Sequence, residues 1–95
     1  ASSYGNPVHA TANGRITQAG WVNGYGYMVE IDHGNGIKTR YGHNSAILVS
    51  VGDQVVEGQT ISLIGSTGNS TGPHCHYEVR VNGEAVDPTL FLPAR

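Results

Sequence analysis

The chain has 95 residues and a formal net charge of −2, with 14 glycines and 4 prolines. This length suits one domain with a modest core, and the near balance of charge argues against a nucleic-acid binder. No apolar run is long enough to span a membrane. The glycines lie between short apolar runs, which predicts an all-β fold: a small, mainly antiparallel β-sandwich or barrel-sandwich without a substantial helix.

In chain order, residues 1–6 are small and polar and are expected to form a loose N-terminal end. Asn-Gly or Gly-rich turns separate the alternating runs that follow, and His33-Gly34-Asn35-Gly36 is a strong hairpin signal. One short strand is expected between Gly52 and Gly58, and one helical turn over residues 87–92. The other predicted strands cover residues 7–12, 15–22, 27–32, 37–43, 61–64 and 72–81. All 95 residues are assigned to one domain.

The run from Gly72 to Val81 alternates strictly, as a strand with two different faces does. One face is apolar and holds Cys75, Tyr77, Val79 and Val81. The other is ionisable and holds His74, His76, Glu78 and Arg80. Two imidazoles at positions i and i+2 start about 7 Å apart and can reach one small volume. One of them can bind a metal ion while the other handles the proton of a metal-bound water. A solvated pair without function has the same pattern.

The other histidines differ in their surroundings. His43 follows Tyr41-Gly42 at the end of a predicted strand, a position where functional residues often lie. His33 is explained by turn chemistry, and His9 is expected on a solvated strand face, in reserve as a ligand. Cys75 is the only cysteine, so it forms no intrachain disulfide and is expected to be a small buried hydrophobe.

Glu78 shares its predicted strand face with His76. Its carboxylate could accept a hydrogen bond from a metal-binding imidazole. An ion pair with Arg80 or Lys38 explains the residue equally well. The sequence leaves both interpretations open.

Several motifs together carry a family resemblance. These are Tyr41-Gly42-His43-Asn44-Ser45, the hairpin from Val51 to Gln59, the run from Gly65 to Arg80 that contains His74-Cys75-His76, and the ending Val86-Asp87-Pro88. In this order they resemble the M23 family, the LytM/lysostaphin-type zinc endopeptidases that cut peptide cross-bridges of bacterial peptidoglycan. The match runs from about Asn6 to Leu92, and its Ser-Thr-Gly-x-Ser-x-x-x-His-x-His run is specific.

The resemblance implies roles for three histidines. His76 matches the zinc-binding second His of the His-x-His motif, His74 the catalytic first His, and His43 the catalytic His across the cleft. In that family the metal polarises a water and the peptide carbonyl, while the two non-ligand imidazoles handle the proton and stabilise the oxyanion. The implied cofactor is therefore Zn²⁺, and the implied partners are peptidoglycan peptides outside the cytoplasm, in the cell wall, periplasm or medium.

The sequence departs from the family pattern at one place. The family takes two further zinc ligands from a His-x-x-x-Asp motif before the segment that matches residues 7–10, and residues 1–6 contain neither His nor Asp. A catalytic zinc site normally has three protein ligands, so an incomplete metal site is expected in this chain. Three explanations stand: a trimmed piece of an active enzyme, an inactive relative that binds the wall or activates a hydrolase, or ligands from another chain or from His9. An absent first strand would also leave a sheet edge that could recruit a second copy.

Overall fold

The computed structural model describes residues 5–65 and 76–86, and every regular element in these ranges is a β-strand. The all-β prediction is therefore confirmed. The strands are β1 (Pro7–His9), β2 (Gly14–Val22), β3 (Gly26–Gly34), β4 (Ile37–Ile47), β5 (Gln54–Val55), β6 (Thr60–Ile64), β7 (His76–Val81) and β8 (Glu84–Val86). No helix in the described ranges is long and apolar enough to cross a membrane. The helical turn expected at 87–92 lies outside the described residues.

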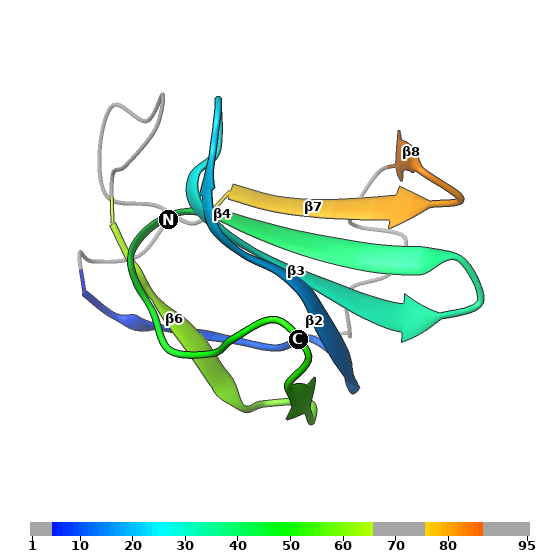
Figure 1. Cartoon of the computed structure of the whole chain (residues 1–95), viewed down its shortest axis with the longest axis horizontal. Coiled ribbons are helices and arrows are strands. Elements are labelled where there is room, and N and C mark those ends of the chain that lie inside the picture. Colours follow the sequence, from blue (N-terminus) through cyan, green and yellow to red (C-terminus); the bar gives the residue numbers. More distant parts are fainter. Residues whose placement is uncertain (1–4, 66–75, 87–95) are drawn as a thin grey trace.

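The strands form one curled antiparallel sheet in the order β1-β6-β4-β3-β2-β5 (Figure 1). β7 leaves this path, pairing with β4 on one side and with β8 on the other. The first half of β4 pairs with β7, its second half pairs with β6, and β3 runs along its other edge. Strand β4 thus connects the two parts of the sheet.

The hairpin turns follow the sequence signals. β3 and β4 are joined by Asn35 and Gly36, at φ of 55° and 78°, and β7 and β8 by Asn82 and Gly83, at 52° and 87°. Two consecutive residues with positive φ match the right-handed twist of paired strands, and Asn-Gly adopts them at low cost. The strand β8 after the second turn was not predicted.

The core takes buried side chains from most strands of the curled sheet. The buried cluster is built from Val8, Ala10, Ile16, Val29, Ile31, Tyr41, Val55, Ile61 and Ile64. In β7, Val79 is fully buried and Tyr77 packs against this cluster, whereas Glu78 and Arg80 join ion pairs. The predicted alternation of β7 is thus confirmed for its described side chains.

Besides the unpredicted β8 and the shorter β1, which ends at His9 and not at residue 12, two segments differ from the sequence expectation. Gly5 and Asn6, expected in the loose end, are hydrogen-bonded through their backbones to Ile64. Residues 44–47, expected as a link, continue β4 because they find a new partner in β6. Each difference arises from pairing with a distant strand, which local sequence does not report.

Candidate functional site

His43 lies where β4 changes its partner from β7 to β6. Its φ of 60° is in the left-handed region, which is costly for a residue with a side chain and persists only where neighbours enforce it. Its N–H donates to the Tyr25 carbonyl at 2.6 Å, and its carbonyl accepts from the Gly65 N–H at 3.0 Å. The residue is 7% exposed. The regular alternation of β4 therefore stops at His43.

Asn44 fixes this corner from the inside. Its fully buried side chain donates through Nδ2 to the carbonyls of Tyr27 and Tyr41, and Ser62 Oγ donates to its Oδ1 at 2.9 Å. Gly65 closes the other side, where a Cβ would lie 2.5 Å from the Ser45 nitrogen. Only glycine fits at that position without moving the backbone.

Strand register brings two of the predicted site residues together. His76, the first residue of β7, is paired with Gly42, the residue before His43. The backbones of His43 and His76 are therefore neighbours across the β4–β7 ladder, although 33 positions separate them in the sequence. His74 and Cys75 lie outside the described residues, and the side-chain roles expected for His74 and His76 stay predictions.

The described residues also bear on the metal site. No three His, Cys, Asp or Glu side chains in ranges 5–65 and 76–86 gather around one point. His33 is held by Asn13, whose carbonyl lies 2.7 Å from Nδ1, and by Thr39, whose hydroxyl lies 2.7 Å from Nε2. Both ring nitrogens of His33 thus have structural partners, and His9 is exposed on β1. The described residues do not by themselves provide a zinc-binding set, and the expected incompleteness stays a prediction.

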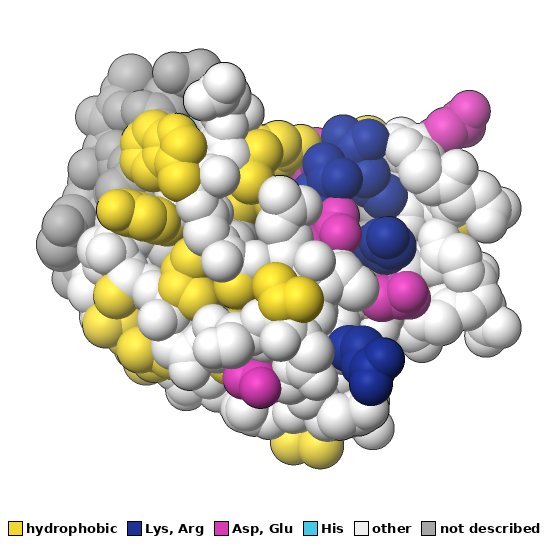
Figure 2. All heavy atoms as spheres, viewed as in Figure 1, with side chains coloured by type: hydrophobic (Ala, Val, Ile, Leu, Met, Phe, Trp, Pro, Cys, Tyr) yellow, Lys and Arg dark blue, Asp and Glu magenta, His cyan; other side chains and the backbone are white. Residues whose placement is uncertain are grey.

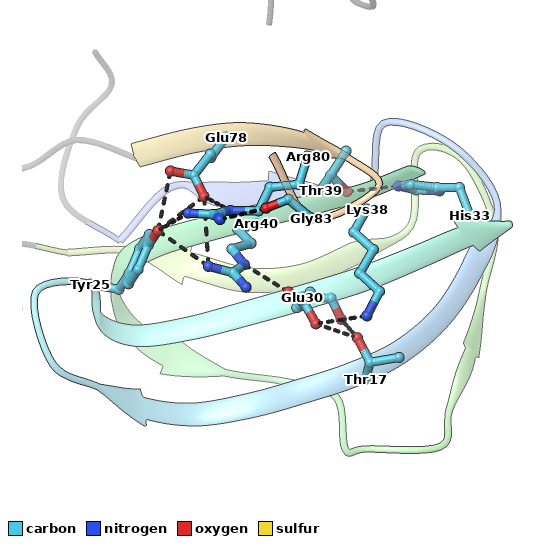
Figure 3. A network of polar contacts seen from close by, with 10 residues as sticks. All are labelled: Thr17, Tyr25, Glu30, His33, Lys38, Thr39, Arg40, Glu78, Arg80 and Gly83. Carbon is cyan, nitrogen blue, oxygen red and sulfur yellow. Dashed lines mark hydrogen bonds and ion pairs between the residues drawn. The ribbon is translucent and has the colours of Figure 1, made fainter. Parts of the chain in front are cut away.

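A charged set of side chains lies beside this corner, on the face of β3, β4 and β7 away from the core. Figure 3 shows this charge network, which we define as Tyr25, Glu30, Arg40, Glu78 and Arg80. In the space-filling view, basic and acidic side chains alternate in a band across this face (Figure 2). The cross-strand register explains the band, because Glu30 pairs with Arg40 and Arg40 with Glu78.

Tyr25 is the centre of the half of the charge network that lies next to the candidate site. Its hydroxyl donates to the Glu78 carboxylate, at 2.9 Å from Oε1 and 3.1 Å from Oε2. It accepts longer bonds from Arg40 at 3.3 Å and Arg80 at 3.4 Å. The Arg40 guanidinium also sits 5.6 Å from the centre of the Tyr25 ring. Glu78 therefore forms the ion pair with Arg80 that the sequence allowed, with 2.7 Å between Arg80 Nε and Glu78 Oε1. It also contacts Arg40 and Tyr25, which the sequence did not suggest as partners.

Glu30 anchors the other half of the network and is only 5% exposed. Arg40 Nε donates to it at 2.7 Å and Thr17 Oγ1 at 2.8 Å, while the Lys38 ammonium lies 3.8 Å away. Burial opposes the ionised form, but the bonds from Arg40 and Thr17 and the nearby positive charges outweigh it and lower the pKa of Glu30 below 4.5.

The pKa of Glu78 is lowered in the same way. Burial again opposes ionisation, and the hydrogen bonds from Arg80 and Tyr25, with the charges of both arginines, outweigh it. The pKa values of Arg40 and Arg80 are raised. For Arg40 burial opposes the rise and the bonds to Glu30 and Tyr25 overcome it; for Arg80 the bond to Glu78 is the leading cause.

Sequence reasoning missed Tyr25 and Arg40. Tyr25 stands in the glycine-rich turn Asn23-Gly24-Tyr25-Gly26, where a large aromatic residue between two glycines was the available signal. Arg40 reads as an ordinary polar position on a strand. Its contacts with β3, β7 and the turn that holds Tyr25 depend on register, which alternation alone does not reveal.

The sequence and the fold are both similar to those of known proteins. The sequence model of Peptidase family M23 matches residues 1–88. Over 94 residues the chain is 50% identical to the DD-carboxypeptidase/endopeptidase Mpg of Neisseria meningitidis, covering 98% of this chain and 22% of that protein. Over 91 residues it is 45% identical to the murein hydrolase activator EnvC of Escherichia coli, covering 96% and 22%.

Among solved structures, the catalytic domain of lysostaphin from Staphylococcus simulans superposes with a TM-score of 0.90 at 41% identity, covering 95% of this chain and 72% of that one. The chain belongs to Peptidase family M23. It spans about a fifth of the length of the two curated relatives, one of which is named as a peptidase and the other as an activator of hydrolases.

Proposed function

We propose that the chain is a peptidoglycan-directed zinc metalloendopeptidase domain that hydrolyses peptide bonds of cell-wall cross-bridges outside the cytoplasm. The observation that carries this proposal is the register of β4 and β7. It makes the backbone of His43 a neighbour of the backbone of His76, the second His of His-x-His and the first residue of β7. Family membership and the similarity to Mpg support it.

In this proposal each histidine has one role. His76 is the zinc ligand that this chain contributes, with further ligands supplied from outside the described residues. When bound, zinc would polarise a water molecule and the scissile carbonyl. His43, held rigidly by the Tyr25 and Gly65 backbones, would donate to the developing oxyanion, and His74 would accept the proton of the attacking water.

The test uses the full-length gene product, zinc titration and cross-linked wall peptides. We expect His76→Ala to weaken zinc binding, and His43→Ala to retain zinc while hydrolysis falls at least about a hundredfold. Lys38→Gln, on an exposed part of the same sheet, is the matched control and should change neither. Zinc binding without hydrolysis by the unaltered protein would refute the peptidase proposal.

A second candidate function is a non-catalytic module that binds the wall or activates a hydrolase. The similarity to EnvC favours it. This candidate predicts that the protein pulls down with purified sacculi or stimulates a separate hydrolase without releasing muropeptides itself. Retention of that stimulation in a His43→Ala, His76→Ala double variant would favour it over the peptidase. Absence of both binding and stimulation would count against it.

A further inference from the structure

Tyr25 touches the candidate site through two different groups. Its backbone carbonyl accepts the N–H of His43 at 2.6 Å, a shorter bond than the one from the Gly65 N–H to the His43 carbonyl at 3.0 Å. Its side-chain hydroxyl donates to Glu78, two residues after His76 on β7. One residue in the turn between β2 and β3 thus contacts both strands that bear predicted site histidines, as the labelled side chains in Figure 3 show for the hydroxyl end.

We propose that Tyr25 is a positioning residue that fixes His43 relative to the start of β7. This proposal rests on the proposed function, because His43 and His76 are the groups being positioned. Tyr25 itself carries no chemistry here. It acts because its side chain is anchored on Glu78, which holds its carbonyl against the His43 N–H.

The anchor is strong for a partly exposed tyrosine. Its main acceptor is an ionised carboxylate that Arg80 holds from another side at 2.7 Å, and bonds to charged groups are stronger than neutral ones. The Arg40 guanidinium over the ring restrains the side chain further. Tyr25 stands between two glycines with positive φ, at 86° and 71°, and its N–H donates to the Val22 carbonyl at 3.0 Å, which closes the turn. The side chain anchored on Glu78 is a second restraint, from the other end of the residue, on where the carbonyl lies.

The position of the Tyr25 carbonyl matters because His43 has a left-handed backbone conformation. A residue at φ of 60° relaxes toward the common regions unless its neighbours hold it. A looser Tyr25 carbonyl would weaken its hydrogen bond with the His43 N–H and leave the bond from Gly65 to the His43 carbonyl. Small displacements of a catalytic group lower the reaction rate out of proportion to their size.

The experiment compares Tyr25→Phe with Tyr77→Phe in the full-length gene product. Tyr25→Phe retains the ring and removes only the anchoring hydroxyl. Tyr77→Phe makes the same chemical change on β7 but on the opposite face, where its hydroxyl lies 3.2 Å from Thr11 Oγ1. Amide hydrogen exchange by NMR reports the His43 N–H directly, and steady-state kinetics on wall peptides report kcat and KM separately.

For Tyr25→Phe we expect the His43 amide to exchange about tenfold faster or more, with core amides such as that of Ile16 unchanged. We expect kcat to fall about 10- to 100-fold with KM within about twofold, because orientation is lost while substrate contacts remain. Tyr77→Phe should leave both quantities at the wild-type level.

Unchanged exchange at His43, or an equal increase across all core amides, would overturn the proposal. So would unchanged kcat in an active protein. If the unaltered protein binds zinc and cleaves nothing, the proposed function fails, and the exchange measurement alone decides whether Tyr25 holds His43.

Discussion

Strands β4 and β7 carry two polar networks on opposite faces. The charge network lies on one face and joins carboxylates to guanidinium groups through Tyr25. On the core face a hydroxyl network joins Thr11, His33, Thr39, Tyr41 and Tyr77. Both networks link strands that are distant in the sequence, so either could define their register.

The difference between the networks is chemical. The hydroxyl network sits against the apolar cluster, where an unpaired charge would be very costly, and it uses groups that can both donate and accept. Apart from the buried Glu30, the charge network is partly exposed to water and salt, and it depends on ionised carboxylates. We therefore expect the first to respond mainly to loss of a hydroxyl, and the second to charge, pH and salt.

Removal of Arg40 should produce the largest loss of stability. Arg40→Met leaves the buried Glu30 with Thr17 and a distant Lys38, and we expect the free energy of unfolding to fall by about 3 kcal/mol. Urea unfolding measures the change. Arg15→Met, an exposed arginine of the same sheet, should cost less than about 0.5 kcal/mol. Equal losses of unfolding free energy in the two variants would show that the contact between Arg40 and Glu30 does not stabilise the fold.

Loss of one core-side hydroxyl should come next. Tyr41 is 1% exposed, and its hydroxyl contacts Thr39 at 2.8 Å and the backbone N–H of Thr11 at 3.2 Å. Tyr41→Phe removes both contacts from a buried position, while Thr39 keeps its bond to His33, so we expect a cost of about 1–3 kcal/mol. Urea unfolding at low and high salt should give the same cost at both. A marked salt dependence would remove the proposed contrast between the networks.

Acid should weaken the charge network selectively. The folded pKa values of Glu30 and Glu78 are lowered, so their contribution is complete above about pH 4.5 and is lost as the pH falls through the folded pKa values. Glu30→Gln should therefore reduce stability at pH 7, and its difference from wild type should shrink as the pH falls below 4.5 through the lowered folded pKa of Glu30. Urea midpoints measured in steps from pH 7 downward test this, and an unchanged difference at all pH values would contradict the prediction.

The smallest effect is expected at Lys38. Its ammonium lies 3.8 Å from Glu30, and its side chain is 43% exposed. Lys38→Gln should change the free energy of unfolding by at most about 0.5 kcal/mol, since exposed ion pairs contribute little. A larger loss in urea unfolding would mean that Lys38, and not only Arg40, holds the Glu30 side of the network.

Features set by adjacent residues were predictable from the sequence. The Asn-Gly turns and the alternation of β7 are local patterns, and both appear as expected. The Tyr41-Gly42-His43 and His-x-His motifs also pointed to the corner that register then assembled. Motifs identify which residues matter without showing how the backbone brings them together.

The remaining features depend on pairing between distant strands. His43 adopts a left-handed conformation because the pairing partner of β4 changes there from β7 to β6. The residues around His43 in the sequence give no sign of this change. The link from Tyr25 to Glu78 joins residues 53 positions apart. Side-chain spacing along one strand carries no information about such contacts.

The most direct test of the central claim is a crystal structure of the zinc-loaded full-length protein with anomalous scattering measured at the zinc edge. The account predicts one strong anomalous peak at a ring nitrogen of His76, with the His43 ring facing the same small volume. A peak away from His76, or a His43 ring turned to a different face of the sheet, would contradict it.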